Sequence, residues 1–316
     1  MDKQRTFTGK TLSLVIPCYN EEDVLPLLTE RLENLRNDID GEVEFVFVDD
    51  GSKDKTWDLL SEYTSNKAHA DAFRLSRNFG HQTAVSAGLQ QTTGDLVAVI
   101  DADLQDPPEI IPDMIRKWET GFDVVYAVRK NRKENFILKF CYFLFYRLLK
   151  KMANIDVPLD SGDFSLMDKK VVDQINAMPE HNRFIRGMRG WVGFKQTGHE
   201  YERDGRAAGK PKYNFKKLLE LAMDGMISFS SLPLRIAGWL GVFAALFGFI
   251  YLLIELIKMF FFQTPPGGWA STIAIIIFFG GIQLIMLGIL GQYVGRIFDE
   301  VKNRPHFIIS ENTREK

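Results

Sequence analysis

The stretch LVAVIDADLQD, residues 96–106, decides the fold of this chain. It begins with an uncharged apolar run, which is typical of a strand buried on both faces of a parallel sheet. Two acids, Asp101 and Asp103, follow directly, and Pro107 and Pro108 then end the strand. Because open α/β sheets bind their ligands at the carboxyl ends of the strands, we expect these acids to line a ligand site.

The same turn carries a candidate metal site. The carboxylates of Asp101 and Asp103 and the side-chain amide oxygen of Gln105 can converge there. Mg²⁺ and Mn²⁺ prefer such oxygen ligands and leave coordination positions for phosphate. We therefore predict a Mg²⁺ or Mn²⁺ site held by these three residues. The alternative is a solvated acidic loop, because an isolated Asp-x-Asp pair is common in loops.

Short apolar runs alternate with segments of helical spacing through the first 130 residues. The runs that read as strands, besides 96–100, are residues 12–17, 44–48, 72–75 and 123–128. Segments with apolar residues at helical spacing follow at 23–36, through Trp57, through Ala84 and at 107–118. This alternation predicts an α/β fold with a mostly parallel, doubly wound, Rossmann-like sheet.

Composition narrows the class of protein. The chain has 316 residues and a formal net charge of −2, so no nucleic-acid-binding surface is expected from the total charge. Cys18 and Cys141 are the only cysteines, and their spacing fits neither a metal site nor a disulfide framework. The first residues are polar, so we expect no cleavable signal peptide and a catalytic half that stays in the cytosol.

Two long apolar segments lie near the C-terminus. Residues 236–254 and 270–290 are uncharged and long enough to cross a bilayer, with a short uncharged loop between them. They predict a two-helix transmembrane hairpin with spans at about 234–262 and 269–295. Lys and Arg flank its outer ends, so the positive-inside rule predicts that both termini are cytosolic. Glu255 and Lys258 lie near the end of the first span, where their side chains can form an ion pair or extend to the membrane interface.

The segment between the sheet and the hairpin carries two amphipathic stretches, 136–149 and 214–229. Both are predicted to lie in the membrane interface, although ordinary packing on the sheet is the alternative. The predicted organisation is a core at 1–130, an acceptor-side segment at 131–231, the hairpin at 232–298 and a cytosolic tail at 299–316. Small residues in the second span suit close packing of the two helices within the hairpin. The same residues also allow a homo-oligomer, which is the second reading of this pattern.

Four strand ends carry polar segments that together resemble a known family. These are PCYNE at 17–21, DDGS at 49–52, SRNFG at 76–80 and DAD at 101–103. In this order they resemble the inverting glycosyltransferases of the GT-A fold. The segment DADLQDPP, 101–108, is similar to the branch that glycosylates polyprenyl phosphates, such as dolichol-phosphate mannose synthases and bacterial bactoprenol glucosyltransferases. The resemblance covers residues 11 to about 230, and the hairpin resembles that of the bacterial glucosyltransferases.

The resemblance implies a nucleotide-sugar site. Asp49 would accept a hydrogen bond from the uracil or guanine ring, and Arg77 and Gly80 would line the diphosphate. The metal held by Asp101 and Asp103 would stabilise charge on the departing nucleotide. The donor-binding residues implied are Pro17, Tyr19, Asn20, Glu21, Asp49, Asp50, Ser52, Arg77, Gly80, Asp101 and Ala102.

The acceptor side is implied to be basic, as a lipid phosphate requires. Phosphate-binding candidates are Arg129, Arg132, Lys139, Ser161 and Arg183, with Arg186 as a secondary candidate. The catalytic candidates are Asp103, Arg129 and Asp160, of which Asp160 is the proposed base or acceptor-positioning acid. The segment SGDF, 161–164, departs from the family pattern by an inserted Asp163, so the assignment of Asp160 rests on a loose match. No role is assigned to His81 or His199.

The predicted function is transfer of a hexose, foremost glucose from UDP-glucose, to polyprenyl (undecaprenyl) phosphate with inversion at the cytosolic face of a bacterial inner membrane. The alternatives are mannose transfer from GDP-mannose, a processive polysaccharide synthase and a non-catalytic nucleotide-binding membrane scaffold. Two spans are too few for a flippase, so we expect a separate flippase and a downstream transferase as partners.

Overall fold

The structure is a computed structural model that describes residues 5–129, 161–202, 232–262 and 268–314. The chain divides into two compact units, Met1–Leu218 with Pro305–Lys316, and Leu219–Arg304. The predicted interface helices at 136–149 and 214–229 lie outside the described residues.

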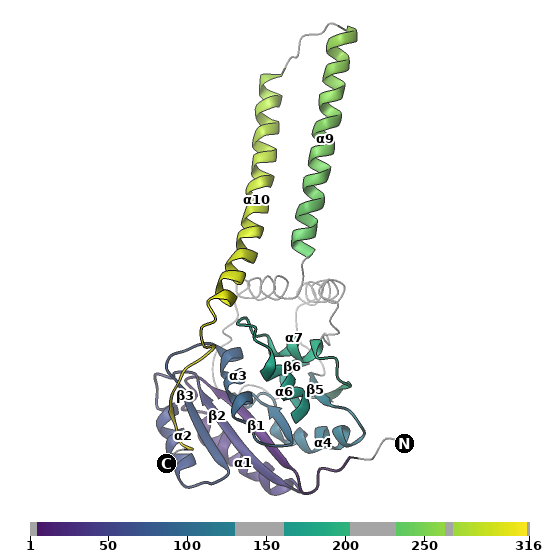
Figure 1. Ribbon diagram of the computed structural model, residues 1–316. Helices are drawn as coiled ribbons and strands as arrows, with labels where there is room; N and C mark the ends of the chain where they lie inside the picture. Colours follow the sequence, from purple (N-terminus) through teal and green to yellow (C-terminus); the bar gives the residue numbers. More distant parts are fainter. Residues whose placement is uncertain (1–4, 130–160, 203–231, 263–267, 315–316) are drawn as a thin grey trace. The chain divides into compact units, whose positions relative to one another are not determined.

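The described part of the first unit forms an eight-stranded sheet of order β7-β5-β6-β4-β1-β2-β3-β8 (Figure 1). Parallel pairs join β4, β1, β2 and β3, and a further parallel pair joins β5 and β7. The bounds of these strands are β1 Thr11–Cys18, β2 Glu42–Asp49, β3 Ala70–Leu75, β4 Leu96–Val99, β5 Val124–Arg129 and β7 Gln196–Tyr201. The five strands predicted from the apolar runs are thereby confirmed, and the sheet is mostly parallel.

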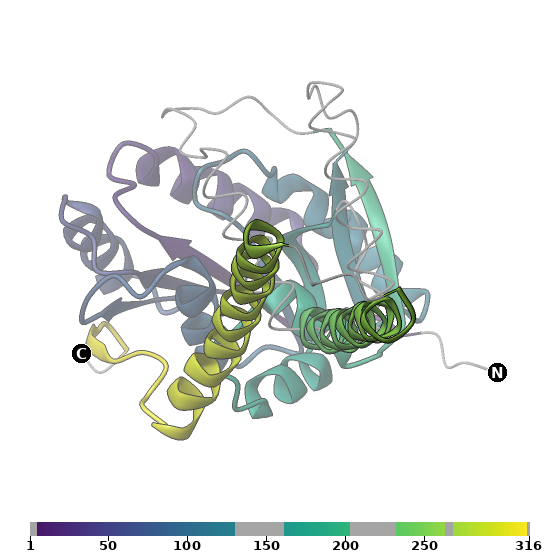
Figure 2. The same ribbon diagram turned by 90° about the horizontal axis from the view of Figure 1, so that it is seen from above.

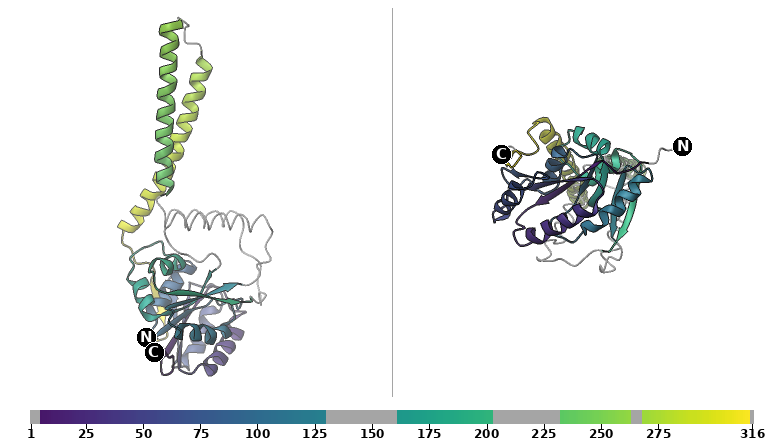
Figure 3. Two further views of the ribbon diagram at one scale, coloured as in Figure 1. Left: turned by 90° about the vertical axis from the view of Figure 1, so that its right-hand side faces the viewer. Right: turned by 90° about the horizontal axis from the view of Figure 1, so that it is seen from below.

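Helices cover both faces of the sheet, as the view from below in Figure 3 shows. One face packs against α1 (Leu25–Asp38), α2 (Thr56–Ser65) and α4 (Ile111–Glu119), which the short helix η1 (Pro108–Ile110) precedes. The other face packs against α3 (His81–Gln91), α6 (Lys169–Ala177) and α7 (Ile185–Trp191). Side chains of β1 alternate between the two cores, with Leu14 and Ile16 in the first and Val15 in the second.

Two antiparallel strands depart from the simple parallel pattern. β6 (Ser161–Asp168) lies between β4 and β5 and runs antiparallel to both. β8 (Ile309–Asn312) runs antiparallel to β3 at one edge of the sheet, opposite the edge formed by β7 (Figure 2). The sequence reading predicted neither of them, nor β7.

The second unit contains two long helices, α9 (Leu232–Phe262) and α10 (Trp269–Val301). They lie side by side as a hairpin in Figures 1 and 3. Residues Leu232–Phe261 and Thr272–Val301 are long and apolar enough to cross a membrane. Lys258 Nζ donates to Glu255 Oε1 at 3.0 Å, which confirms the predicted pairing of these two residues.

Candidate active site

The carboxyl ends of β1 to β4 meet at one edge of the sheet, and the segments after them form the candidate site. In the sheet register Cys18 lies beside Asp49, and Asp49 lies beside Arg74. β4 adjoins β1 on its other side and leads into Asp101. The four polar segments singled out in the sequence therefore follow neighbouring parallel strands and share one rim.

Hydrogen bonds join the loop after β1 to the loop after β2. The Asn20 N–H donates to Ser52 Oγ at 2.9 Å, and the Lys53 N–H donates to Asn20 Oδ1 at 2.9 Å. Asn20 adopts the left-handed conformation, with φ 53°, which asparagine tolerates better than most residues. The Glu21 N–H donates to Thr56 Oγ1 at 2.9 Å. Asn20 and Ser52 therefore fix the shape of this part of the rim.

Three other predicted donor residues lie near these loops. Pro17 lies in β1 beside Val48, and Tyr19 follows the end of that strand with a half-buried side chain. Ala102 is buried in the first hydrophobic core. Their predicted contacts with a nucleotide would come from the loop backbone and from Tyr19.

Asp49 has one carboxylate oxygen without a hydrogen-bond donor. Its side chain is fully buried, and Oδ1 accepts from the Ser52 N–H at 3.0 Å. Oδ2 has no hydrogen-bond partner, although the Nε atom of Arg74 lies 3.4 Å away. Burial raises the pKa of Asp49, against the hydrogen bonds from Ser52 and the charge of Arg74. A ligand N–H would satisfy this oxygen.

Asp50 joins the loop after β2 to the loop after β3, and both of its carboxylate oxygens are used in doing so. Its Oδ1 accepts from the Phe79 N–H at 2.7 Å and its Oδ2 from the Gly80 N–H at 2.9 Å. A Cβ atom on Gly51 would lie 2.6 Å from the backbone carbon of Arg77, so the two loops approach too closely for any side chain there. Asp50 thus orients the segment that was predicted to line the diphosphate.

Arg77 and Gly80 occupy that segment. Arg77 is exposed, with its guanidinium carbon 3.9 Å from the centre of the Phe79 ring, and its Nη1 donates to the Asn78 carbonyl at 3.0 Å. Gly80 has a φ of 98° and begins α3. The arrangement leaves the remaining guanidinium donors of Arg77 at the surface.

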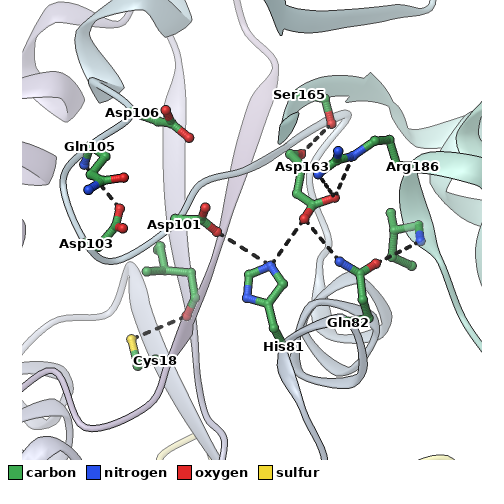
Figure 4. A network of polar contacts seen from close by, with 12 residues as sticks. Cys18, His81, Gln82, Asp101, Asp103, Gln105, Asp106, Asp163, Ser165 and Arg186 are labelled. Atoms are coloured by element: carbon green, nitrogen blue, oxygen red, sulfur yellow. Dashed lines mark hydrogen bonds and ion pairs between the residues drawn. The ribbon is translucent and has the colours of Figure 1, made fainter. Parts of the chain in front are cut away.

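Asp101 and Asp103 lie on different arms of the loop after β4. Asp101 Oδ1 is 3.6 Å from His81 Nε2 and has no hydrogen-bond partner. Asp103 Oδ1 accepts from the Gln105 N–H at 3.2 Å, and Leu104 between them has a φ of 56°. Figure 4 shows Asp101 turned towards His81, while Asp103 and Gln105 lie beyond the bend.

The metal hypothesis can be tested against this donor set. Among the described residues, no group of three or more His, Cys, Asp or Glu side chains is arranged to hold an ion. The buried, unpartnered oxygen of Asp101 nevertheless suits a cation, with Asp103 on the same loop. Mg²⁺ is commonly held by one or two carboxylates, with substrate phosphates and water completing its shell. These residues fit a metal that arrives with a phosphate-bearing substrate.

The structure also reveals a charged cluster that the sequence reading missed. His81 Nε2 lies 3.5 Å from Asp163 Oδ2, so it sits between Asp101 and Asp163 (Figure 4). Gln82 Nε2 donates to Asp163 Oδ2 at 3.1 Å, and Arg186 Nε donates to Asp163 Oδ1 at 3.3 Å. His81 was left without a role, and Asp163 was treated as an insertion. The sequence signal was the position of His81 directly after Gly80, at the start of α3.

The charges of this cluster influence one another. Burial opposes protonation of His81, but Asp163 and Asp101 outweigh it and raise the pKa of His81 to about 9. Burial raises the pKa of Asp101 to about 6, although His81 opposes the shift. Burial likewise works against ionisation of Asp163, but Arg186 and His81 hold its pKa well below the usual range. At neutral pH the cluster therefore contains a protonated His81 between two carboxylates.

The acceptor candidates that the structure describes lie at the end of β5 and the start of β6. Arg129 Nε donates to Tyr201 Oη at 3.2 Å, and Arg129 Nη2 lies 3.5 Å from Asp106 Oδ2. The Tyr201 hydroxyl donates to Asp106 Oδ1. Val128 pairs with Ser161, and Gly162 lies close to the Arg129 guanidinium. Arg129 and Ser161 are thus brought together.

The other acceptor candidates are not part of this arrangement. Arg183 is buried and donates to the carbonyls of Met178 and Ile175 at the end of α6, at 2.9 and 2.7 Å. Its described contacts are therefore those of a residue that stabilises a helix end. Arg132, Lys139 and Asp160 lie outside the described residues.

Comparison with known proteins identifies the family. The family described as "Glycosyl transferase family 2" matches residues 13–175. The chain belongs to this family. The description "GtrB C-terminal hairpin" matches residues 232–297, which contain the two apolar helices. This glycosyltransferase thus has a GT-A catalytic domain followed by a hairpin of two candidate membrane spans.

Similar proteins span nearly the whole chain of the glycosyltransferase. It is 46% identical to "Uncharacterized glycosyltransferase YkcC" of Bacillus subtilis over 95% of this chain and 93% of that protein. It is 40% identical to "Bactoprenol glucosyl transferase" of Shigella phage SfII over 96% of this chain and 98% of that protein. Among solved structures, glucosyl-3-phosphoglycerate synthase from Mycobacterium tuberculosis, in complex with Mn²⁺ and UDP, has 19% identity and a TM-score of 0.45, covering 69% of this chain and 78% of that one.

Proposed function

We propose that this glycosyltransferase moves a glucosyl group from UDP-glucose to a polyprenyl phosphate, with inversion, at the cytosolic face of the membrane. One observation supports it most directly. Asp49 and Asp101, on two strand ends of the same rim, each keep a buried carboxylate oxygen without a hydrogen-bond donor. Buried polar atoms in native proteins are almost always paired, so both oxygens suit a ligand. The names of similar proteins, bactoprenol glucosyl transferases at 40% identity, supply the acceptor and the sugar.

On the donor side, Asp49 Oδ2 would accept the ring N–H of uracil. Uracil and guanine both offer such a donor, so Asp49 by itself allows UDP-glucose or GDP-mannose. Tyr19 and the fixed loop around Asn20 and Ser52 would border the base and ribose. The exposed Arg77 and the backbone at Gly80 would lie against the diphosphate.

A divalent cation, Mg²⁺ or Mn²⁺, would be held by Asp101 and Asp103 with Gln105 nearby. When bound, such a metal neutralises charge on the diphosphate and so eases departure of the nucleotide. His81, positively charged at neutral pH, lies 3.6 Å from Asp101 and partly balances that carboxylate. We propose that His81 and Asp163 fix the orientation of Asp101 at the rim.

On the acceptor side, Arg129 and Ser161 would bind the lipid phosphate. An ionised phosphate oxygen forms the new bond to the anomeric carbon of glucose as the bond from that carbon to UDP breaks. Displacement from the opposite side inverts the anomeric configuration. The phosphate is already ionised at neutral pH, so orientation by cations matters more than removal of a proton. Asp160 remains a proposed acceptor-positioning acid.

The hairpin would keep this site at the bilayer surface, where the lipid phosphate is found. We further propose a bacterial inner-membrane location, with a separate flippase and a downstream transferase acting on the lipid-linked sugar. A homo-oligomer formed through the small residues of the second span belongs to the same proposal.

The test is transfer of radiolabel from UDP-glucose to undecaprenyl phosphate by the purified full-length protein in detergent. We expect a labelled glycolipid with Mg²⁺ or Mn²⁺ and none with EDTA. Product from GDP-mannose but not from UDP-glucose would replace the donor and keep the reaction class. Nucleotide binding without transfer from any donor would support a binding scaffold and contradict the proposal.

A further inference from the structure

The last strand of the sheet comes from the end of the chain, after the hairpin. β8 pairs antiparallel with β3, and the sheet is extended at both ends of β8 by hydrogen bonds from Ser76 N–H to the Ile308 carbonyl at 2.9 Å and from Thr313 N–H to the Ala72 carbonyl at 3.0 Å. Phe307 and Ile309 pack on a small core at the β3 edge. β8 is therefore an integral part of the catalytic unit.

One side chain of β8 makes two polar contacts with the sheet unit. Glu311 lies directly opposite Arg74 in the register. Glu311 Oε1 accepts from Arg74 Nη1 at 2.9 Å, and its Oε2 accepts from Trp57 Nε1 at 3.2 Å. The guanidinium carbon of Arg74 lies 5.6 Å from the centre of the Trp57 ring, within the range of a cation–π contact. Glu311 and Trp57 together restrict where the Arg74 guanidinium can lie.

The other side of the same guanidinium reaches Asp49. Arg74 is the neighbour of Asp49 in the register of β2 and β3, and Arg74 Nε lies 3.4 Å from Asp49 Oδ2. This is the oxygen that lacks a hydrogen-bond donor and that we assign to the nucleotide base. Arg74 thus connects Glu311 on β8 to the proposed donor site, through two different nitrogen atoms of one planar guanidinium.

We propose that Glu311 is a positioning residue for donor binding, because it holds Arg74 beside Asp49 and so fixes the carboxylate that accepts from the nucleotide base. This inference rests on the proposed function, since it takes Asp49 to bind the base. Without Glu311 the guanidinium is free to turn towards solvent, and Asp49 loses its only ion-pair partner among the described residues. Burial raises the pKa of Asp49. The charge of Arg74, which lies outside the loop that carries Asp49, opposes that rise.

The test compares the wild-type protein with Glu311→Ala, Arg74→Ala and the double variant, all as full-length protein in detergent with Mg²⁺. UDP is the binding probe, and transfer from UDP-glucose gives KM and kcat. A hydrogen bond to a charged group is worth enough that we expect about a tenfold rise in the Kd for UDP and in the KM for UDP-glucose in each single variant. The kcat and the KM for lipid phosphate should change less than about twofold, since neither contact reaches the acceptor side.

The double variant and a matched control separate positioning from general stabilisation. If Glu311 acts through Arg74, the double variant should bind UDP about as weakly as either single variant. Arg314→Gln is the control, because Arg314 Nε pairs with Asp71 Oδ2 at 2.7 Å at the same strand junction without reaching Asp49. It should leave the Kd for UDP within about twofold of wild type. Glu311→Gln, which keeps the size and one acceptor, serves if the alanine variant fails to fold, with an intermediate Kd expected.

The outcomes distinguish the inference from the proposed function. Wild-type protein that binds UDP, together with Glu311 variants that bind it equally well, would overturn the positioning role and leave the function intact. Equal losses in Glu311→Ala and Arg314→Gln would mean that β8 acts only as structural support, which also overturns it. Wild-type protein that binds neither UDP nor GDP would remove the proposed donor, and the inference with it.

Discussion

At the scale of single residues, the rim separates carboxylates that hold the protein together from carboxylates that are left for a ligand. Asp50 uses both oxygens on backbone N–H groups of the next loop, whereas Asp49, its neighbour, keeps one oxygen without a hydrogen-bond donor. Asp101 keeps one as well. Adjacent residues of the same type thus have different roles, because backbone donors occupy both oxygens of Asp50 but only one oxygen of Asp49.

Asp101→Asn is the first residue-scale prediction. The change removes the charge that we assign to the metal while keeping the side-chain size, so metal-dependent transfer should fall at least ~100-fold with the fold intact. Transfer is measured with radiolabelled UDP-glucose, and folding by thermal unfolding. Asp113→Asn, at a partly exposed position of α4, is the control and should retain full activity. Near-normal transfer by Asp101→Asn would remove the metal role.

Arg129→Ala is the second residue-scale prediction. Losing the cation that we assign to the lipid phosphate should raise the KM for undecaprenyl phosphate by about tenfold or more, with little change in the KM for UDP-glucose. Steady-state kinetics with each substrate varied in turn provide the measurement. Arg116→Ala, at an exposed arginine of α4, should change neither constant. Equal changes in both constants for Arg129→Ala would argue against an acceptor site there.

At the scale of elements, strands with continuous apolar runs were predictable, whereas strands rich in polar residues were not, including β6 inside the sheet and β8 at its edge. β1, β2 and β4 are buried on both faces, so their sequences are continuously apolar, with few exceptions. β6 reads SGDFSLMD and β8 reads ISEN, and polar residues in both obscure the strand signal. The missed Asp163 has the same cause: it lies on the other side of His81 from Asp101 because β6 inserts beside β4, where Val99 pairs with Ser165. The rim acids were predictable because they end apolar strands.

A pH prediction belongs to the junction of α1 with α2 and β3. Burial alone would raise the pKa of Glu33, but hydrogen bonds from Lys67, Tyr63 and His69 lower it to about 2. The folded-state pKa lies below the unfolded one, so this contribution is complete above pH ~4.5 and is lost as the pH falls towards 2, up to ~3 kcal/mol. Glu33→Gln should therefore flatten the loss of stability in that range.

The measurement is chemical unfolding between pH 5 and pH 3, followed by intrinsic fluorescence, for wild type and for Glu33→Gln. Glu30→Gln is the matched control on the same helix, at an exposed position. It should follow the wild-type curve. Parallel curves for wild type and Glu33→Gln would contradict the assigned stabilisation.

At the scale of the whole molecule, the sheet constrains how the hairpin can cross a membrane. The strands before α9 and the strand after α10 belong to one sheet, so both ends of the hairpin must emerge on the same side of the bilayer. The positively charged flanks in the sequence predict that this side is the cytosol. Chain topology and charge distribution therefore agree on a single orientation.

The corresponding prediction uses reporters in a bacterial host. If both termini are cytosolic, alkaline phosphatase inserted into the loop at 263–267 should be active, and green fluorescent protein fused after residue 316 should fluoresce. With the reporters exchanged, phosphatase fused after residue 316 and green fluorescent protein inserted into the loop should both be inactive. Phosphatase activity at the C-terminus would contradict the cytosolic orientation, and phosphatase activity at both positions would also contradict the shared side, because β8 could not then join the sheet.

The position of β8 in the chain also sets the order in which the enzyme can be completed. A ribosome releases β8 only after both helices of the hairpin have been made, so the catalytic sheet leaves the edge of β3 open throughout synthesis of the hairpin. An open strand edge is prone to pairing with other chains, and Glu311 reaches Arg74 only when that edge closes. The proposed donor site is thus completed last, after the hairpin has been synthesised.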